Sequence, residues 1–565
     1  MSESINPAIK VAKVLDSRLT AGRDPTYLLH QGASEITYRS FPSSNLSSSS
    51  VIYNNVNPPS AQTFVSRTVY VEVQYQVNFT GTALPGQNLL DGYGYDWSVR
   101  ALPVNNSFKS LTVSINGSNF TQDQNDVLAP LTRVRYDSLK CFLSQAPTVL
   151  DNAQLYSEGV GTNRNPLASA QNAPCDAVMP RGAFEGVTVL TNTPTAGSIL
   201  IRSVEPLIIS PLAYTDEHSH LPAFYNVSTF QVQATFDAQL ADRIISLSNA
   251  SQATFTSVSA TPTASNIYFG YYAGMLIQKP PAEVSYPWHQ INRYIQSGNN
   301  LAPGATTTLN MNNIQLSSIP SKMYLLIKPT RSSYNIRQTD TFARINSVSV
   351  QFGVRSSLLA NCDANQLYQI SKTSGLDMEW SDFHGNTAGN HPRSWSGVGS
   401  VLSISPMKDL GLSDLATSGT SQTIQVQIQV SYTSLQPSAT LAYDAYLYVV
   451  SDGLISIPGA GVLYQQESIT ARQDLLNAPF LPSSLTSKDV YEGGSFFGDI
   501  KSFFQNPPQW LKTTVDVGKK VLPYVAPLIG LGGLSGGMRR GAGDTGGGLS
   551  GGAKISKKKL LALMN

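Results

Sequence analysis

The segment at residues 421–432, SQTIQVQIQVSY, alternates between apolar and polar residues from Ile424 onward. Successive side chains of a β-strand point to opposite faces, so a period of two predicts a strand with one buried face. The same pattern recurs at residues 69–79 and 230–236. The chain is therefore predicted to be all-β, with strands that come in similar sets.

The composition favours several domains and self-association over binding to polyions. A chain of 565 residues is too long for one ordinary hydrophobic core. Charged residues make up 13% of it, against roughly 25% in typical soluble proteins, and such a surface suits dense packing against other copies. The net charge is only +2, but residues 490–565 carry ten Lys/Arg and four Asp/Glu, or +6, which leaves −4 elsewhere.

The cysteines give no sign of a disulfide framework or a zinc site. Cys141, Cys175 and Cys362 are scattered and form no CxxC or Cys/His ligand pattern. The N-terminal residues lack the apolar core of a signal peptide, so a reducing compartment, cytosolic or nuclear, is expected.

Few residues suggest catalysis or metal binding. Residues 216–220, DEHSH, place carboxylates beside an H-x-H pair, but no third histidine lies at a telling spacing, which favours a solvated loop. His289, beside Trp288, is expected to be packed or at an interface rather than catalytic. No Ser/His/Asp or Cys/His set stands out. We therefore predict a protein that is not an enzyme and that binds no cofactor or metal.

Two sets of strand patterns follow each other along the chain. Ile209-Ser210-Pro211 ends one strand, and an alternating strand begins 19 residues after the proline. Ile404-Ser405-Pro406 ends another, and an alternating strand begins 18 residues after its proline. The prolines are 195 residues apart, and a similar shift carries the strand near Val69 to residues 266–268, where we place the start of the second set. Residues 109–117 and 345–353 are also alike.

This repetition predicts two β-domains of one design in tandem. We expect an N-terminal arm at residues 1–60, a first domain at 61–262 and a second domain at 263–452. A C-terminal arm at 453–489 and a tail at 490–565 are expected to follow.

The tail differs in kind from the rest of the chain. Its large apolar residues fall on one face of a predicted helix, which is followed by a second short helical segment. We expect this face to contact a membrane or a protein partner, the alternative being a core helix under the second domain. The residues concerned are Phe496, Phe497, Ile500, Phe503, Phe504 and Trp510.

The end of the tail is rich in glycine and basic. Residues 530–552 contain 12 glycines in 23 positions and are predicted to be flexible. Lys557, Lys558 and Lys559 suit contact with nucleic-acid phosphates or with an anionic lipid surface, the alternative being a solvated terminus.

The stretch at residues 317–432 carries a family resemblance. It contains, in order, SSIPSKMYLLIKP, TDTFARINSVSVQFG, NQLYQISKTSG and SWSGVGSVLSISPMKDLGL, followed by the alternating strand. With the tandem design, this running order resembles the double jelly-roll major capsid proteins of tailless icosahedral double-stranded DNA viruses. That family includes adenovirus hexon and proteins of virophages, Polinton-like viruses and nucleocytoplasmic large DNA viruses. The resemblance covers roughly residues 60–455.

The resemblance implies a fold, an assembly and a location. The fold is two tandem eight-stranded jelly rolls with extended N- and C-terminal arms and a flexible, partly helical C-terminal tail. The assembly is a homotrimer of pseudo-hexagonal outline, because two jelly rolls in each of three chains place six around one axis. Such trimers form an icosahedral shell with penton and minor capsid proteins. The expected location is the virion, assembled in the host cytoplasm or nucleus.

The tail resembles a different protein, the membrane-lytic minor capsid protein of adenoviruses. Residues 534–538 and 549–553 also fit the Leu-x-Gly-Gly-x pattern that adenovirus-type maturation cysteine proteases cut. The resemblance implies a viral maturation protease as partner, with candidate cleavage sites at Gly537, Met538, Gly552 and Ala553. The tail is accordingly expected to contact membrane lipid, minor capsid proteins or the genome.

A carbohydrate-binding or carbohydrate-active β-sandwich protein is the alternative from another functional class. The chain has 26 tyrosines and five tryptophans, whose rings can stack on sugars. That interpretation predicts aromatic side chains clustered on one exposed face, and it leaves the tail unexplained.

Overall fold

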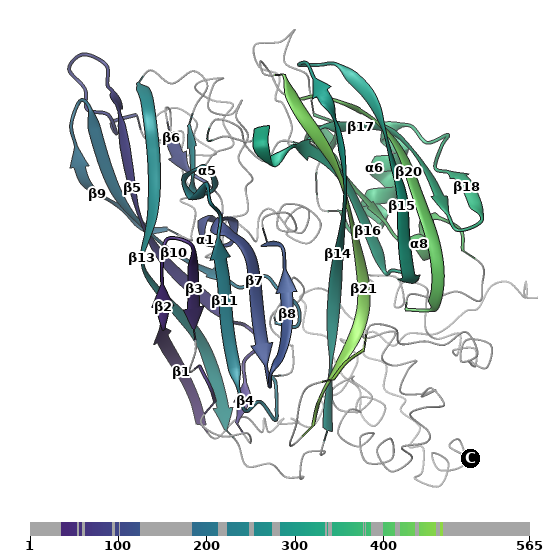
Figure 1. Cartoon of the computed structure of the whole chain (residues 1–565), viewed down its shortest axis with the longest axis horizontal. Coiled ribbons are helices and arrows are strands. Elements are labelled where there is room, and N and C mark those ends of the chain that lie inside the picture. The colour runs from purple at the N-terminus through teal and green to yellow at the C-terminus, as the bar shows by residue number, and fades with distance from the viewer. Residues whose placement is uncertain are drawn as a thin grey trace, which may run out of the picture.

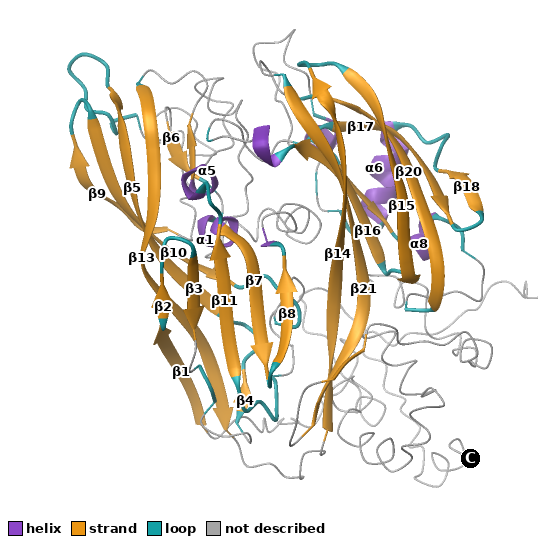
Figure 2. Ribbon diagram, viewed as in Figure 1, coloured by secondary structure: helices purple, strands orange, loops and turns teal. Residues whose placement is uncertain are grey.

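The described residues of the computed structural model run from 35 to 466 with several internal gaps, the longest at 125–183, 213–222 and 386–398. Within them, the strands form two β-sandwiches that stand side by side with their strands running in similar directions (Figure 1). Strands dominate this part of the chain, and the helices are short (Figure 2). The prediction of an all-β fold is confirmed.

The second sandwich is a jelly roll, in which sequential antiparallel strands are shared between two packed sheets. One sheet has the order β14-β21-β16-β19 and the other β15-β20-β17-β18, while the short β22 (Tyr464–Gln466) pairs with β21. The eight main strands are β14 (Glu283–Leu301), β15 (Thr306–Ser318), β16 (Lys322–Pro329), β17 (Arg344–Phe352), β18 (Arg355–Leu358), β19 (Val401–Ile404), β20 (Ser421–Thr433) and β21 (Leu441–Pro458).

The first sandwich has the same plan with additional strands. Its sheets have the orders β1-β13-β5-β10-β9, with β4 beside β13, and β2-β3-β11-β7-β8, while β6 and β12 form a separate pair. The strands are β1 (Glu35–Pro42), β2 (Asn45–Leu46), β3 (Ser50–Tyr53), β4 (Phe64–Val65), β5 (Tyr70–Thr82), β6 (Trp97–Val99), β7 (Phe108–Ile115), β8 (Ser118–Gln122), β9 (Phe184–Asn192), β10 (Ala196–Pro206), β11 (Phe230–Phe236), β12 (Ile245–Leu247) and β13 (Thr254–Ala273).

Each main strand of the first sandwich therefore has a counterpart in the second. In one sheet, β1, β13, β5 and β10 correspond to β14, β21, β16 and β19. In the other, β3, β11, β7 and β8 correspond to β15, β20, β17 and β18. The prediction of two tandem jelly rolls of one design is confirmed.

The alternating segments form the central strands of these sandwiches. In β20, Ile424, Val426, Ile428, Val430 and Tyr432 are buried in the core of the second sandwich, whereas the intervening glutamines face outward. Its counterpart β11 buries Phe230, Val232, Ala234 and Phe236 in the core of the first sandwich in the same way. The period of two thus identified equivalent strands of the two repeats.

The predicted landmarks of the repeat hold at the later strands and fail at the opening one. The first Ile-Ser-Pro tripeptide follows β10, and the second begins at the last residue of its counterpart β19. Residues 109–117 and 345–353 overlap the counterparts β7 and β17. Residues 266–268, however, lie in β13, which pairs with β5 and β1 of the first sandwich. The second sandwich begins with β14. Ile267, Phe269 and Tyr271 of β13 fill the first core, so this segment alternates without opening a new domain.

The strand pairing also corrects the expected domain boundaries. The division between residues 262 and 263 falls inside β13, and the change of sandwich lies between β13 and β14. The expected N-terminal arm contains β1, β2 and β3, which join both sheets of the first sandwich. The first residues of the expected C-terminal arm, 453–458, continue β21. These N-terminal strands are short or lie at sheet edges, so they lack a clear alternating pattern.

Five α-helices occur in the described residues, and the longest has a well-defined start. α6 (Ala364–Thr373) begins at a capping box, in which Asp363 accepts a hydrogen bond from the Gln366 backbone N–H at 2.8 Å and Gln366 accepts one from the Asp363 N–H at 3.0 Å. It packs beside β19 and buries Leu367. The other helices are α1 (Pro103–Ser107), α5 (Leu240–Ile244), α7 (Trp380–His384) and α8 (Pro406–Asp409).

The orientation of β20 can be tested by truncating one side chain on each face. Ile428→Ala is expected to lower the free energy of unfolding by about 2–5 kcal/mol, because it leaves a cavity in a closely packed core. Gln429→Ala, on the exposed face, is the matched control and is expected to change it by about 0.5 kcal/mol or less. Denaturant unfolding measures both, and equal effects would contradict the assigned faces.

Candidate functional site

Strands β21, β16 and β19 of the sheet β14-β21-β16-β19 are buried on both faces, whereas the edge strand β14 is partly exposed. In β16, Met323, Leu325 and Ile327 fill the core of the second sandwich, whereas Tyr324 and Leu326 point to the other side. Those two side chains belong to a second apolar cluster that includes residues of the first sandwich. Its other buried members are Leu102, Ile208, Phe342, Leu376, Met378, Phe383, Val401, Tyr446, Tyr448 and Val450. This sheet therefore joins the two sandwiches.

Strands β14 and β21 also extend beyond the second sandwich and complete the core of the first. They run down beside β7 and β8 in Figure 1, and Tyr286, Trp288, Ile455 and Ile457 belong to the first core. The Trp288 ring packs edge-on against Phe120 of β8, with 5.7 Å between ring centroids. The two jelly rolls share a hydrophobic core, so their relative orientation is set by packing.

His289 lies at the point where β14 passes from one sandwich to the other. It is the direct neighbour of Asp452 on β21, and its Nδ1 is 2.8 Å from Asp452 Oδ1. The Ser321 hydroxyl donates to the same carboxylate oxygen at 2.9 Å. From the first sandwich, Ser210 Oγ accepts a hydrogen bond from the His289 backbone N–H at 2.8 Å. This position agrees with the expectation of a packed, interfacial histidine.

A buried carboxylate holds the loop that presents Leu102 to the second sandwich. Glu205 of β10 is fully buried and accepts hydrogen bonds from the backbone N–H groups of Val104 and Asn105 at 2.8 and 2.9 Å. The Asn105 amide and the Ser203 hydroxyl donate to it as well, at 2.8 and 2.9 Å. Burial raises the pKa of the Glu205 carboxyl, and the donated hydrogen bonds, which favour its ionised form, oppose that shift.

The equivalent sheet of the first sandwich has an exposed outer face rich in aromatic side chains. We call this the tyrosine face, and its members from β1, β5 and β13 are Ile36, Tyr38, Tyr70, Tyr268 and Tyr272. Tyr38 is 77% exposed, Ile36 55% and Tyr70 36%. A Cβ on Gly270 would lie 3.2 Å from the Tyr38 ring and 3.1 Å from the Tyr272 hydroxyl, so both side chains pack over this glycine.

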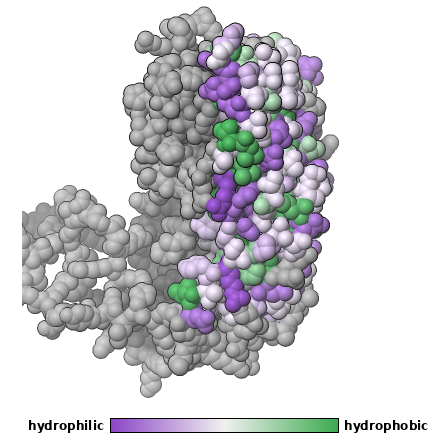
Figure 3. Space-filling view, turned by 90° about the vertical axis from the view of Figure 1, so that its left-hand side faces the viewer, coloured by the Kyte–Doolittle hydropathy of each residue, from purple (hydrophilic) through white to green (hydrophobic). Residues whose placement is uncertain are grey.

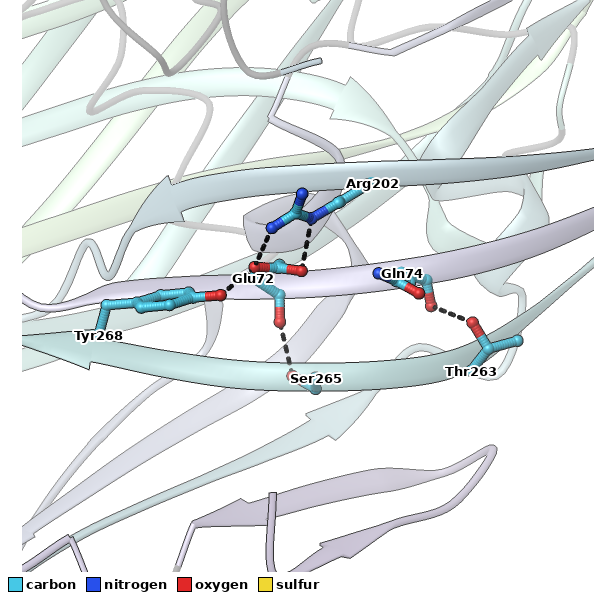
Figure 4. A network of polar contacts seen from close by, with 6 residues as sticks. All are labelled: Glu72, Gln74, Arg202, Thr263, Ser265 and Tyr268. Atoms are coloured by element: carbon cyan, nitrogen blue, oxygen red, sulfur yellow. Dashed lines mark hydrogen bonds and ion pairs between the residues drawn. The ribbon is translucent and has the colours of Figure 1, made fainter. Parts of the chain in front are cut away.

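An ion pair lies beside the tyrosine face on the same sheet (Figure 4). The Glu72 carboxylate on β5 accepts hydrogen bonds from Arg202 Nε at 2.6 Å and from Arg202 Nη2 at 3.0 Å, and a further one from the Tyr268 hydroxyl. Burial alone would raise the pKa of Glu72, but the hydrogen bonds from Arg202 and Tyr268 outweigh burial and hold it below its usual value. The backbone carbonyl of Glu72 also accepts a hydrogen bond from Ser265 Oγ at 2.7 Å.

The surface around these groups is mainly polar. Figure 3 shows the side of the first sandwich that lies at the left of Figure 1, where hydrophobic residues form separate patches among hydrophilic ones. This surface contrasts with the outer face of β21, β16 and β19, whose side chains belong to a buried apolar cluster.

The site residues predicted in the tail lie outside the described part of the chain, which ends at residue 466. They are the apolar face at 496–510, the candidate cleavage positions at 537–538 and 552–553, and the lysines at 557–559. The DEHSH segment at 216–220 also falls in a gap. Among the described residues, no group of three or more His, Cys, Asp or Glu is placed to hold a metal ion. No helix in the same residues is long and apolar enough to cross a membrane.

Sequence reasoning missed both sheet faces. The available signal for the buried face was the unbroken apolar run in β16 and β21, which indicates burial on two sides. For the tyrosine face, the sequence placed Glu72 among the polar residues of an alternating strand. Tyr38 and Ile36 of this face lie in β1, within the segment interpreted as an arm, so the aromatic cluster could not be recognised.

Comparison with known proteins shows similarity to virophage capsid proteins over both sandwiches. A family model described as Sputnik virophage major capsid protein 1st domain matches residues 8–278, and one described as Major capsid protein V20 C-terminal domain matches residues 291–453. The chain is 28% identical over 529 residues to the Putative capsid protein V20 of Sputnik virophage, covering 89% of this chain and 87% of that protein.

Solved structures show the same similarity to virophage capsid proteins. A chain in the cryo-EM structure of the Sputnik virophage has a TM-score of 0.77 and 26% identity, covering 87% of this chain and 100% of that chain. The crystal structure of the mavirus major capsid protein has a TM-score of 0.66 and 15% identity, covering 85% and 100%, and so supports the fold. These matches do not favour the carbohydrate-binding alternative, although the tyrosine face is a cluster of the kind that it predicted.

The Glu72 network generates a prediction about pH. Its lowered pKa means that the ion pair stabilises the fold above the unfolded-state pKa of about 4.3 and that this contribution is lost as pH falls through the folded-state value. Glu72→Gln is expected to lower the free energy of unfolding at pH 7 by about 1–3 kcal/mol. The difference from the unmodified chain should shrink below pH 4.3.

Urea titrations at pH 7 and in the acid range measure this difference, and Gln76→Ala on the same face of β5 is the control with little expected effect. A difference that stays constant down to acid pH would contradict the role given to the ionised carboxylate.

Proposed function

The chain is a double jelly-roll major capsid protein, and we propose that it builds an icosahedral shell from homotrimers of pseudo-hexagonal outline. The observation that carries this proposal is the repetition of one jelly-roll plan in two sandwiches that share a core. Because packing sets their relative orientation, each chain presents two similar bodies at a defined angle. Three such chains around one axis give six bodies in a ring, which suits a sixfold position in a shell.

The described chain begins and ends at one end of the molecule, which suggests an orientation in the shell. Glu35 of β1 pairs with Ala273 at the end of β13, and β22 pairs with the last part of β21. Both points lie at the lower end in Figure 1. We propose that this end faces the interior. The +6 charge of residues 490–565 then supports contact with the packaged genome, with anionic lipid or with minor capsid proteins.

The remaining features of the tail fit the same orientation. An apolar face at residues 496–504 is suited to a membrane interface or a groove on a minor capsid protein. A viral maturation protease acting after Gly537 or Gly552 would shorten the tail after assembly. Intact-mass analysis of protein from virions distinguishes a full-length chain from either product.

Assembly is tested on the purified recombinant chain. Light scattering coupled to size exclusion is expected to give three times 60.8 kDa, or about 182 kDa, and negative-stain images are expected to show hexagonal outlines. A chain truncated after residue 489 is the control, since removing the tail leaves both sandwiches intact. A strict monomer at every salt concentration and pH would contradict the proposal.

The tail is tested with liposomes that contain anionic lipid. The full-length chain is expected to co-float with these vesicles at low salt and to be released at high salt, because screening weakens the attraction of its basic residues. The chain truncated after residue 489 is expected to remain unbound. Equal flotation of the two proteins would show that lipid contact does not depend on the tail.

A further inference from the structure

The tyrosine face holds the largest group of exposed apolar side chains in the described part of the chain. Seven large hydrophobic side chains are exposed in those residues. Three of them, Ile36, Tyr38 and Tyr70, lie on this face, and the other four are spread over β9, β14 and the turn before β18. A group of exposed apolar side chains on a soluble protein commonly marks a binding surface.

The size of the face is set by three adjacent strands. β1, β13 and β5 are neighbours in one sheet, so the face is about 10 Å wide. Along β13, Tyr268 and Tyr272 are four residues apart, which corresponds to about 13 Å. A Cβ on Gly270 between them would lie within 3.3 Å of the rings of Tyr38 and Tyr272, so these rings pack over the glycine. The area matches the footprint of a short helix.

One segment of this chain has both the length and the chemistry for that footprint. The helix predicted at residues 496–504, FFGDIKSFF, is about 13 Å long. Its five large apolar residues, four of them phenylalanines, fall on one face, and Gly498, Asp499, Lys501 and Ser502 fall on the opposite one. Aromatic rings packed against each other contribute beyond the area that they bury, so a phenylalanine face suits a tyrosine face.

The N-terminal residues, which directly precede β1, are less suited to this surface. Residues 1–34 contain a single Phe, Tyr or Trp, at Tyr27, whereas residues 496–510 contain five. The tail therefore offers the aromatic side chains that the N-terminal residues lack.

The charges on the two surfaces are also compatible. Glu72 and Arg202, which border the tyrosine face, already neutralise each other through two hydrogen bonds. Asp499 and Lys501 leave the predicted helix without net charge, and both lie away from its apolar side. Covering the face with this helix consequently leaves no lone charge in a dry contact.

The tail can reach the tyrosine face from the point where the described chain ends. β22 and β1 both lie at the lower end of the molecule (Figure 1). The 29 residues at 467–495 connect β22 to the predicted helix and span at most about 100 Å when extended. Such a tether gives an effective concentration of about 1 mM, so a contact with a Kd of about 0.1 mM keeps the helix docked for about nine tenths of the time.

We propose that the tyrosine face binds the helix at residues 496–504 of the same chain and shields its apolar side until the tail meets an anionic lipid surface. The inference rests on the proposed lipid contact of the tail and adds its regulation. A docked helix has its phenylalanines against the tyrosines and cannot place them in a membrane. A change that clears the tyrosine face therefore releases the tail.

Vesicle flotation tests the release of the tail in the full-length chain. Tyr38→Glu places a charge where the phenylalanines pack, and vesicles of phosphatidylcholine and phosphatidylserine in equal parts are the target. We expect half-maximal flotation at roughly tenfold lower lipid concentration, because a helix that is free for about a tenth of the time binds with a tenth of its intrinsic affinity. The introduced carboxylate repels this lipid, so it cannot itself cause the gain.

Ile295→Glu is the matched control for this variant. Ile295 is a 45% exposed apolar residue on β14, outside the tyrosine face, and flotation is expected to be unchanged. Both positions are exposed, so circular dichroism and thermal unfolding are expected to remain as in the unmodified chain. A Tyr38→Glu variant that floats no better than the Ile295→Glu variant would contradict the docking.

Cross-linking locates the helix without any lipid. In a chain whose three cysteines are replaced by serine, the double variant Tyr38→Cys, Gln505→Cys is treated with a short bis-maleimide. We expect an internal link, recovered as a cross-linked peptide by mass spectrometry, in a product that runs as a monomer on a denaturing gel. The pair Ile295→Cys, Gln505→Cys is the control and is expected to give far less of this product.

The outcomes separate this inference from the function on which it rests. An internal cross-link in a chain that binds no vesicles, with or without Tyr38→Glu, would overturn the lipid contact and leave the docking standing. Normal flotation with no effect of Tyr38→Glu and no internal cross-link would overturn the docking and leave the lipid contact standing. Cross-linked dimers in place of the internal product would assign the face to the tail of another copy and overturn docking within one chain.

Discussion

The burial of both faces of strands β16, β19 and β21 determines how this chain is arranged. Side chains of β16 alternate between the core of the second sandwich and the cluster shared with the first, so nearly every residue of the strand is apolar. A sheet buried in this way cannot slide or rotate without exposing one of its faces to water. The Glu205 carboxylate contributes from the other side, since it fixes the start of α1 and thereby the loop that carries Leu102. The angle between the jelly rolls is consequently a property of the folded chain.

The equivalent sheet of the first sandwich has a polar outer face instead of an apolar one. β5 keeps its inward valines but turns Glu72 and further polar residues, among them Gln74 and Gln76, outward, so its alternation is clean. A charge on that face is tolerated because Arg202 and Tyr268 hydrogen-bond to it, which leaves the carboxylate ionised even though it is largely buried. One fold therefore accommodates either an apolar or a polar outer face, and the sequence of the outward positions decides which one is formed.

The sequence predicted the parts of the fold in which one face of a strand is buried and the other is wet. This held for β5, β11 and β20, and the Ile-Ser-Pro landmarks correctly paired β10 with β19. The prediction failed for strands that do not have one buried and one exposed face. β1 is an edge strand with mostly exposed residues, and β14 serves two cores and contains Pro287, so neither shows a period of two. The tyrosine face depends on β1 pairing with β13, more than 200 residues away, and such long-range pairing leaves no local signal.

The difference between the two outer faces follows from whether the folded chain covers them. The contact between jelly rolls of one chain forms during folding and need never reopen, so it can consist of Leu102, Ile208, Leu326 and other apolar side chains. A face that the two sandwiches leave open must remain soluble, and an apolar patch of that kind there would promote aggregation. Tyrosines beside a neutralised ion pair satisfy this condition, because they are compatible with water and still offer large rings for packing. The repeated jelly roll thus has an apolar outer face where the folded chain covers it and a polar, tyrosine-rich outer face where it does not.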